Sequence, residues 1–451
     1  MSLPPSLPLP SPLQTLLWIR RPTELMQYCR RRYGQAFRIK LLPFSIALFS
    51  DPESIRTIFA SKSDEMRAGE VNRILRVLVG ESSVLLLDGD EHMRHRKLLL
   101  PSFHGERMRF YGEAMAAITR ATCADWSETD AFSLHPYTQE ITLQIILRTV
   151  FGAEEGPELT TLHHQIKRLL SFAEHRISLP AMVYMSTRPE LETRVPFKWL
   201  LTARDETDTL LYHQIGARRV DKRTRTRNDV LAMLMQARDE DGQPLTDREL
   251  RDELVTALAA GHETTATALA WAFERILSTP AVYARLRDEI DAAGGTSASP
   301  DRFATLPYLD ATIKEVLRLR PVVPIVGRVL QVPITIGGYD LPAGTAVGAC
   351  IYLAHRNPEV YPEPEAFRPE RFLDVQPDPV SWLPFGGGIR RCIGAQFATY
   401  EMKIVLGTLL ANYDFALAQS TPAKTVRRAI TFWPEAGTRV RVKRRSTTLA
   451  A

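Results

Sequence analysis

Apolar residues recur at helical spacing over most of this chain. The longest such stretch extends from Glu91 to about Leu277, where apolar positions three and four apart predict successive amphipathic helices. Three interruptions divide this stretch into separate helices, namely Gly152-Ala153, Leu179-Pro180 and the basic run 218–227. Helix is therefore the dominant predicted structure.

Strand-like alternation is confined to short stretches. Residues 37–49 alternate between apolar and polar around Pro43, which predicts a hairpin, and Asp51-Pro52 then opens a helix. Residues 329–335 and the Gly337-Gly338 turn predict further short strands. The predicted fold class is therefore mainly α with a minor β region.

One predicted helix is much longer than the others. Thr246-Asp247-Arg248-Glu249 forms a capping box at its start, and Thr279-Pro280 ends it after Ser278. At about 1.5 Å per residue, roughly 33 residues cover about 50 Å, which is enough to cross the core of a whole domain. Gly261 lies near the middle, where glycine costs about 1 kcal/mol relative to alanine. We therefore expect another group to approach Gly261 closely.

Two shorter helices and an irregular segment follow. A helix from about Leu309 to Arg320 is ended by Pro321, and the last helix begins just past Gly394. Between them, residues 358–384 form a proline-rich meander. Nothing in this order of elements divides the chain, so we expect a single domain over residues 1–451.

Composition narrows the class of protein. The 451 residues are 45% hydrophobic and 24% charged, which is typical of a globular chain with a large core. The net charge of +5 is modest, and the basic run 218–227 is interpreted as a solvated loop or helix end rather than a nucleic-acid site, because no aromatic or glycine-rich binding module accompanies it. The cysteines lie far apart with no C-x-x-C pair, which favours a reducing cytoplasm; they are Cys29, Cys123, Cys350 and Cys392.

The two ends of the chain differ from its middle. Residues 1–20 are apolar, but prolines at positions 4, 5, 8, 10 and 12 and the lack of a preceding basic region argue against a spanning helix or a signal peptide. We expect a Pro-rich N-terminal arm over residues 1–20 that packs on the surface, with transient membrane contact as the alternative. Residues 446–451 are expected to form a flexible tail.

The segment Phe385-Gly-Gly-Gly-Ile-Arg390-Arg-Cys392-Ile-Gly394 carries the strongest chemical signal. Three consecutive glycines let the backbone fold tightly against something flat, and a lone cysteine directly precedes a helix. Backbone N–H groups and the helix dipole favour a thiolate there, and a bound metal would deprotonate the sulfur outright. The alternative is a structural cysteine in a turn, which the complete F-x-x-G-x-R-x-C-x-G spacing disfavours.

In every signature position this segment resembles the haem-binding loop of the cytochrome P450 family. The resemblance covers nearly the whole chain and implies a single-domain cytochrome P450 fold, with the long helix crossing a haem b cofactor. It implies that Cys392 is the sulfur ligand to the iron and that Phe385 and Gly394 belong to the cofactor-binding loop.

Two further motifs support the resemblance. Glu315 and Arg318 match the family's E-x-x-R helix, and Arg371 lies in the element that joins this pair. Glutamate and arginine three apart on a helix more often form a surface ion pair. The resemblance instead implies a buried structural network of Glu315, Arg318 and Arg371 that holds the meander and the cysteine loop.

Residues 260–265 match the family's A/G-G-x-D/E-T-T pattern in the long helix. Small residues and threonine in a helix by themselves usually mean close packing. The resemblance implies that Gly261 leaves room for dioxygen beside the haem. It also implies that Thr264 donates a hydrogen bond to the oxygen and that Glu263 relays protons, which makes these two the candidate catalytic residues. His262 is expected to give packing or polar support.

His92 and Arg96 stand four residues apart, on one helical face. An exposed pair is the ordinary interpretation in a chain with 57 lysines and arginines. The resemblance implies that both grip a haem propionate together with Arg328 and Arg390, since arginine suits carboxylate groups. His92 stands where many relatives carry tryptophan, a variant that is frequent among bacterial members.

The implied activity is a monooxygenase that inserts one atom of O2 into an apolar small molecule of the fatty acid, terpenoid or steroid class. A cavity lined by residues 66–88, about 165–200, 322–326 and Ile430-Thr431 is expected to hold it. The alternatives are a peroxide-using or isomerising haem-thiolate enzyme and a non-catalytic haem or lipid-binding protein.

Electrons must come from a separate partner, because no flavin- or nicotinamide-binding domain follows the haem region. We expect a ferredoxin and a ferredoxin reductase, and a monomeric enzyme. Basic residues near the cysteine could steer such a partner, although scattered solvated charge explains them equally well; they are Arg107, Arg109, Arg391 and Lys403.

Overall fold

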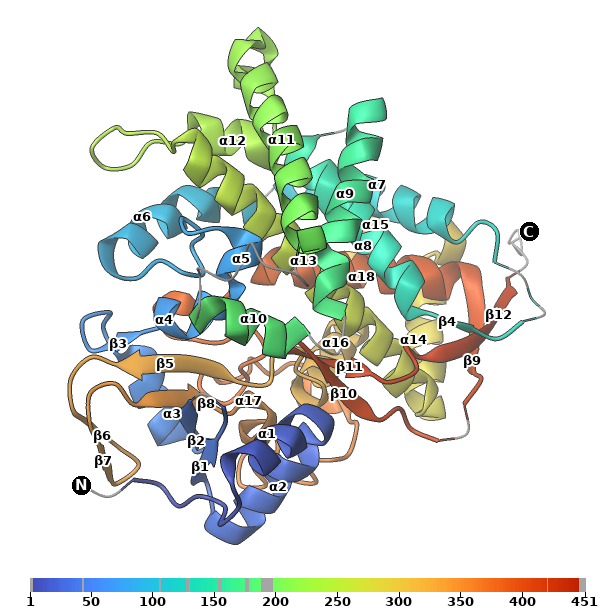
Figure 1. Ribbon diagram of the computed structural model, residues 1–451. Helices are drawn as coiled ribbons and strands as arrows, with labels where there is room; N and C mark the ends of the chain where they lie inside the picture. The colour runs from blue at the N-terminus through green and yellow to red at the C-terminus, as the bar shows by residue number, and fades with distance from the viewer. Residues whose placement is uncertain are drawn as a thin grey trace.

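The computed structural model describes residues 3–445 apart from 43, 105–106, 127, 129, 153–155, 175–177, 188–197 and 420. Helices make up most of the molecule, and the short strands form separate small sheets, the largest at the lower left of Figure 1 and another at its right. The prediction of a mainly α fold with a minor β region is confirmed. Pro43, at the tip of the predicted hairpin, and the expected tail 446–451 lie outside the described residues.

The helices occur in the following order along the chain. They are α1 (Ser11–Arg20), α2 (Pro22–Tyr33), α3 (Pro52–Ala60), α4 (Gly69–Asn72), α5 (Arg76–Val79), α6 (Gly89–Leu99), α7 (Arg107–Thr122), α8 (His135–Phe151), α9 (Pro157–Glu174), α10 (Ser178–Thr187), α11 (Lys198–Val220), α12 (Val230–Gln236), α13 (Asp247–Leu277), α14 (Pro280–Ala292), α15 (Pro300–Ala304), α16 (Pro307–Leu319), α17 (Ile351–Ala354) and α18 (Ala395–Asn412).

The strands are short. They are β1 (Ala36–Lys40), β2 (Ser45–Phe49), β3 (Met66–Arg67), β4 (Phe132–Ser133), β5 (Val326–Leu330), β6 (Ile334–Ile336), β7 (Tyr339–Leu341), β8 (Ala346–Ala349), β9 (Tyr413–Leu417), β10 (Thr425–Arg428), β11 (Thr431–Pro434) and β12 (Arg439–Arg444).

The largest sheet has five strands in the order β1-β2-β8-β5-β3. The predicted hairpin is confirmed, since β1 and β2 pair antiparallel with Ala36 opposite Phe49. The predicted turn at Gly337-Gly338 joins β6 to β7, and both glycines have positive φ, +55° and +78°. Such φ values favour glycine because it has no Cβ.

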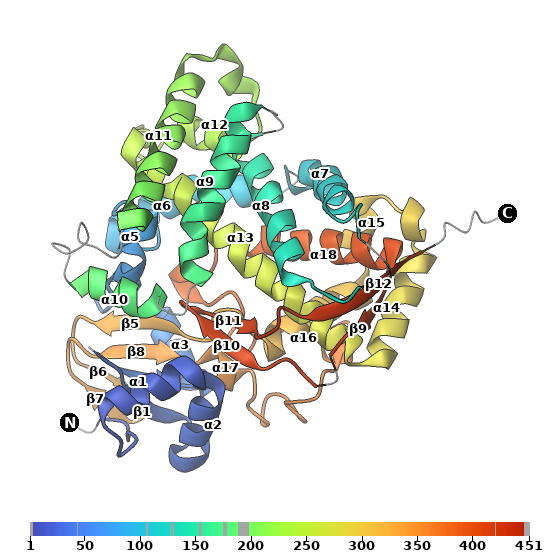
Figure 2. The same ribbon diagram turned by 45° about the vertical axis from the view of Figure 1, so that its right-hand side comes forward.

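The long predicted helix is α13, and it occupies the middle of the molecule (Figure 2). Its capping box is present, with Thr246 and Glu249 bonding to one another's backbone N–H groups, and Ser278 is its C-cap. α13 packs against α8, α16 and α18. Most of its length is buried, whereas Ala260 in its central part is exposed.

The N-terminal segment is packed rather than loose. Residues 11–20, which we expected to belong to a Pro-rich arm, form α1. The Gln14 side chain donates to the carbonyls of Leu7 and Leu9 at 3.2 and 2.7 Å, and Trp18 is buried in a cluster with Leu25 and residues of β1. Of the helices that the structure describes, none is long and apolar enough to span a membrane.

The basic run 218–227 ends α11 and continues into a 3₁₀ turn at Lys222–Thr226. The expected helix end is therefore confirmed, but the run is not fully solvated. Arg218 is buried and pairs with Asp229 at 2.9 Å, and Arg227 pairs with the same carboxylate at 2.9 Å. Two of its arginines thus hold α11 against α12 instead of facing a partner.

Candidate active site

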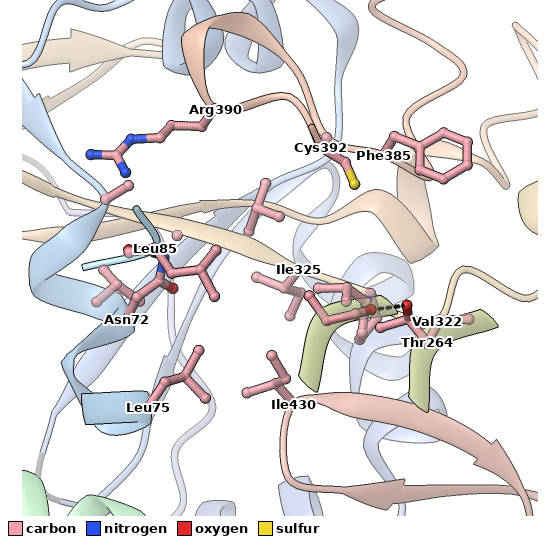
Figure 3. A pocket seen from close by; sticks show the side chains of 18 of the residues that line it. Asn72, Leu75, Leu85, Thr264, Val322, Ile325, Phe385, Arg390, Cys392 and Ile430 are labelled. Carbon is pink, nitrogen blue, oxygen red and sulfur yellow. Dashed lines mark hydrogen bonds between the residues drawn. The ribbon is translucent and has the colours of Figure 1, made fainter. Parts of the chain in front are cut away.

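A cavity of about 960 Å³ lies between the middle of α13, the segment that begins at Phe385 and the loop before β5 (Figure 3). Most of its lining is apolar, with polar groups concentrated around Cys392. It brings together nine of the predicted site residues: His92, Arg96, Gly261, Thr264, Arg328, Phe385, Arg390, Cys392 and Gly394. Glu263 and the predicted network of Glu315, Arg318 and Arg371 lie outside this lining.

The cysteine loop folds back on itself. The N–H of Cys392 donates to the carbonyl of Phe385 at 2.9 Å, and Gly386 and Gly388 take left-handed φ values of +68° and +63°. A Cβ on Gly387 would overlap the ring of Phe59 in α3, and one on Gly388 would overlap the backbone of the same residue. The surface that these glycines approach is therefore Phe59.

Cys392 is accessible from the cavity, which lies inside the protein. Burial raises the pKa of this thiol, more than the Gly394 N–H and the charges of Arg96 and Arg391 lower it. The Gly394 N–H lowers this pKa, as we expected from the sequence, although burial outweighs it. A metal ion bound to the sulfur would supply the further stabilisation of a thiolate.

Positive charge is concentrated beside the sulfur. Burial, together with the charges of Arg390, Arg96 and Arg328, lowers the pKa of His92 to about 3. Within the described part of the chain, the Nδ1 atom of His92 has no hydrogen-bond partner. Asp88 is the counter-charge among the described residues here, since it pairs with Arg390. One carboxylate for three guanidinium groups leaves an excess of positive charge in a partly buried place.

This arrangement fits haem b. A sulfur ligand stands at one wall of an apolar cavity, and haem carries two propionate carboxylates that would balance the surplus guanidinium charge. Arg328 illustrates the need for such balance, because burial and the charge of Arg390 lower its pKa to about 10. His92, Arg96, Arg328 and Arg390 are the residues that would hold these carboxylates.

The same arginines also fasten the cysteine loop to α6 and its preceding turn. Arg96 donates to the carbonyl of Arg391 at 2.8 Å, and Arg390 donates to the carbonyl of Val84 at 3.1 Å. In Figure 3 the Arg390 side chain extends away from the Cys392 sulfur.

Two small or polar residues of α13 face the cavity. The Thr264 hydroxyl donates to the Ala260 carbonyl at 2.6 Å (Figure 3). A Cβ on Gly261 would lie 3.0 Å from the Cδ1 atom of Ile146 in α8. The close neighbour that we expected at this glycine therefore exists, and it is a side chain of the adjacent helix.

Glu263 points away from the cavity, toward α8. Its carboxylate accepts hydrogen bonds from Gln139 at 2.9 Å and Thr267 at 3.0 Å, and it lies 3.5 Å from the His135 ring. Burial raises the pKa of Glu263, but His135, His262 and Gln139 together lower it more, so that the pKa falls below its ordinary value. Glu263 and Thr264 are neighbours in sequence whose side chains have different partners.

His262 gives the polar support that we expected. Its Nδ1 atom lies 3.0 Å from the Thr142 hydroxyl, which also lies 3.0 Å from the His262 carbonyl oxygen. Burial lowers the pKa of His262 to about 4, so the ring is neutral at physiological pH. It ties α13 to α8.

The predicted E-x-x-R network is assembled. Arg318 donates to both carboxylate oxygens of Glu315 at 2.6 and 2.8 Å, and Arg371 Nε lies 3.4 Å from Glu315 Oε1. Neither member of the Glu315–Arg318 pair is exposed to solvent. Arg318 also donates to backbone carbonyls of the meander and its approach, at His355, Pro364 and Ala366.

His355 extends this network to the cysteine loop, although no motif in the sequence predicts it. Its Nδ1 lies 2.9 Å from the Arg318 carbonyl, and its Nε2 accepts from the N–H of Leu383 at 2.7 Å. This pattern places the proton on Nδ1 of a neutral ring. Leu383 stands two residues before Phe385, so His355 is a positioning residue for the loop. No local pattern in the sequence marks such a contact.

The walls of the cavity agree only partly with the prediction. Residues of 66–88 and 322–326 contribute as expected, as do Tyr184 and Ile430. Thr431 does not, because its hydroxyl donates to the Arg428 carbonyl and accepts from Trp433. The structure adds lining residues that we did not predict: Thr15, Trp18, Ile19, Leu41, Leu42, Phe44, Ile46 and Arg427.

Replacing His355 by leucine should destabilise the protein. It leaves the Leu383 N–H and the Arg318 carbonyl buried without partners, each at about 1–3 kcal/mol. Urea unfolding followed by circular dichroism measures the effect. His213→Leu is the matched control, because His213 is exposed, and it should change stability by less than about 0.5 kcal/mol.

The same variant has a pH signature. Burial lowers the pKa of His355 to about 3 from its ordinary 6.5. The neutral ring therefore contributes stability that is fully present above pH 6.5 and is lost as the pH falls from 6.5 toward 3. The leucine variant should lose less stability than the wild type over this window; an equal loss would refute the assignment.

Comparison with known proteins places this site in a family. The family model for Cytochrome P450 matches residues 3–440. Cytochrome P450 135B1 of Mycobacterium tuberculosis is 39% identical over 447 residues, which cover 98% of this chain and 92% of that protein. Cytochrome P450 138 of Mycobacterium bovis is 35% identical over 445 residues, covering 98% and 97%.

Solved structures share the whole fold. Retinoic acid bound cyanobacterial CYP120A1 is 25% identical, with a TM-score of 0.84 and coverage of 99% of this chain and 100% of that one. The heme domain of cytochrome P450DA is 23% identical, with a TM-score of 0.85 and coverage of 99% and 98%.

Proposed function

This chain belongs to the cytochrome P450 family of haem-dependent monooxygenases, and we propose that it inserts one oxygen atom of O2 into an apolar small molecule held in the cavity below α13. One observation carries the proposal. Cys392 and Thr264 line the same apolar cavity (Figure 3), which sets a sulfur ligand and a hydroxyl group around the space where a substrate would lie.

The residues of the chain divide the work. Haem bound through Cys392 supplies the redox chemistry that activates dioxygen. His92, Arg96, Arg328 and Arg390 hold its propionates, and the apolar walls exclude water from the reacting centre. Thr264 holds a proton at its hydroxyl, directly on the cavity wall.

Glu263 is proposed as the internal proton reservoir behind this hydroxyl. Its ionised carboxylate is held by Gln139, Thr267 and His135, which connects the interior of α8 with α13. A change of Glu263 rotamer or a chain of water is needed to pass a proton from this network to Thr264, because the two side chains do not share a hydrogen bond.

The substrate is proposed to be a fatty acid, a terpenoid or a steroid. Apolar side chains line most of the cavity, among them Leu75, Val322, Ile325 and Ile430 (Figure 3). Apolar walls of this kind bind apolar guests by removing their surface from water.

Electrons are proposed to come from a ferredoxin and its reductase. Arg391 is exposed next to Cys392 and suits an acidic partner. Lys403 does not, because its ammonium group pairs with Asp310 at 2.6 Å. The side chains of Arg107 and Arg109 lie outside the described part of the structure. We also propose a cytoplasmic monomer, in which Cys29, Cys123 and Cys350 remain free thiols while Cys392 binds the haem.

The cysteine ligand is tested by spectroscopy. Purified protein that contains haem, when reduced and treated with carbon monoxide, should show the long-wavelength absorption band typical of thiolate ligation. Cys392→Ala should lose this band entirely, whereas Cys123→Ala, which removes a buried thiol outside the cavity lining, should keep it. Wild-type protein with a full complement of haem and no such band would refute the proposal.

The Thr264 hydroxyl is tested by coupling. Thr264→Ala should bind haem normally but release hydrogen peroxide, because proton delivery of this kind is worth roughly 100-fold or more. Product formed per reductant consumed should fall at least tenfold by that estimate, while Thr264→Ser should retain most of the coupling. Unchanged coupling in the alanine variant would remove Thr264 from proton delivery.

The partner is tested by ionic strength. If a basic surface docks an acidic ferredoxin, the rate of haem reduction should fall steeply between low salt and about 0.5 M, where screening acts over only a few ångströms. Reduction by dithionite, a small reductant, should change much less. A ferredoxin-dependent rate that does not respond to salt would exclude electrostatic docking.

A further inference from the structure

Arg427, in β10, lines the cavity, and no described residue gives it an anionic partner. Its Nε donates to the Ala429 carbonyl at 2.9 Å, and its Cζ atom lies 4.6 Å from the centre of the Trp18 ring in α1. Its Nη1 has no hydrogen-bond partner among the described residues. The guanidinium is thus oriented by a carbonyl and an indole ring, with one terminal nitrogen free.

The protein offers this guanidinium no carboxylate in the part of the chain that is described. Burial alone lowers the pKa of Arg427 to about 9, with no contribution from a neighbouring charge. Glu253 is the one acidic residue in the described lining of the cavity. Its carboxylate is already committed to His95 at 2.6 Å and to the N–H of Val84 at 2.8 Å. An unpaired charge in a largely apolar cavity is unfavourable.

Arg427 does not belong to the propionate group. The arginines whose charges act on His92 are Arg96, Arg328 and Arg390, and those that act on Cys392 are Arg96 and Arg391. In Figure 3 Ile430, which follows Arg427 in the same hairpin, lies at the opposite end of the cavity from Cys392. The fifth arginine of the lining therefore stands at the end remote from the sulfur.

The space between the two ends is apolar. Ile325 lies between Ile430 and Cys392 in Figure 3, with Leu75 beside Ile430 and Val322 beside Thr264, and Trp18 and Phe44 contribute aromatic surface. A substrate that pairs with the Arg427 guanidinium and also covers the apolar lining has an anionic head group and a long apolar body. A wholly neutral guest would cover the Arg427 guanidinium without replacing its lost hydration.

We propose that Arg427 is a substrate-binding residue and that the substrate is an amphiphilic carboxylate, such as a long-chain fatty acid. The carboxylate pairs with the guanidinium above Trp18, and the chain extends along the apolar lining toward Cys392. This inference rests on the proposed function, because it selects acids from the substrate classes given above. A planar carboxylate suits a single guanidinium with one free terminal nitrogen.

The test compares acids with neutral molecules of the same length. Isothermal titration calorimetry of the haem-containing protein measures the affinity for decanoate, dodecanoate and hexadecanoate and for the corresponding alcohols. A charge-assisted hydrogen bond predicts that the acids bind roughly ten- to a hundredfold more tightly. A parallel titration of the Soret shift reports whether each guest reaches the haem.

Three variants separate charge from structure. Arg427→Gln should lose roughly ten- to a hundredfold in affinity for the best acid and change the affinity for its alcohol by less than about threefold. Arg427→Lys should recover part of the loss, since it restores the charge. Arg428→Gln is the matched control, because it removes the same charge from the next residue, which is not part of the cavity lining.

Two results would overturn the inference. One is a wild-type protein that binds no acid more tightly than its alcohol. The other is an Arg427→Gln variant that loses affinity for acid and alcohol equally, which indicates a structural role. Failure of the proposed function gives a different result, namely loss of the carbon monoxide band, whereas the calorimetric preference for acids does not depend on that band.

Discussion

The position of the cysteine ligand depends on one buried ion pair, Glu315 with Arg318. Removing both charges from water costs several kcal/mol per ion, and their attraction repays this only if the remaining hydrogen-bonding groups are satisfied. Arg318 meets that condition by donating to three backbone carbonyls around the meander, and Glu315 accepts from the Arg368 N–H. The pair therefore fixes a largely irregular segment, in which a short 3₁₀ helix at Pro369–Phe372 is the regular element. His355 passes this order on to Leu383 and so to the loop that carries Cys392.

The sequence predicts what local chemistry determines. The bounds of α13 follow from a capping box and a proline, whose effects act within a few residues, and the structure confirms both. The conformation of the cysteine loop is also determined locally. Gly386 and Gly388, which take positive φ values, lie within the same ten residues as Cys392. Contacts between distant segments are different. His355 contacts Leu383, and Arg427 contacts Trp18, only when the whole chain has folded. No sequence pattern around either residue of a pair predicts its partner.

The adjacent pair Glu263 and Thr264 shows a second limit of sequence reasoning. Successive residues on a helix point about 100° apart, so two neighbours in a motif need not place both side chains in one cavity. The structure uses this rotation: Thr264 faces the cavity, while Glu263 and His262 face α8 and bond to Gln139 and Thr142. The motif marks both residues as candidates, but the contact between α8 and α13 places the Glu263 carboxylate behind the helix.

Positive charge lies at two separate ends of the cavity. At one end, guanidinium groups outnumber carboxylates around Cys392, and a cofactor with two carboxylates restores the balance. At the other end, Arg427 stands alone above Trp18, and no described side chain of the lining can neutralise it. The cofactor would not serve both ends, since the arginines around His92 and Cys392 would bind its carboxylates. If the cavity is to be free of uncompensated charge when it is filled, the second anion must therefore come from the guest itself, and its apolar part must lie between the two ends.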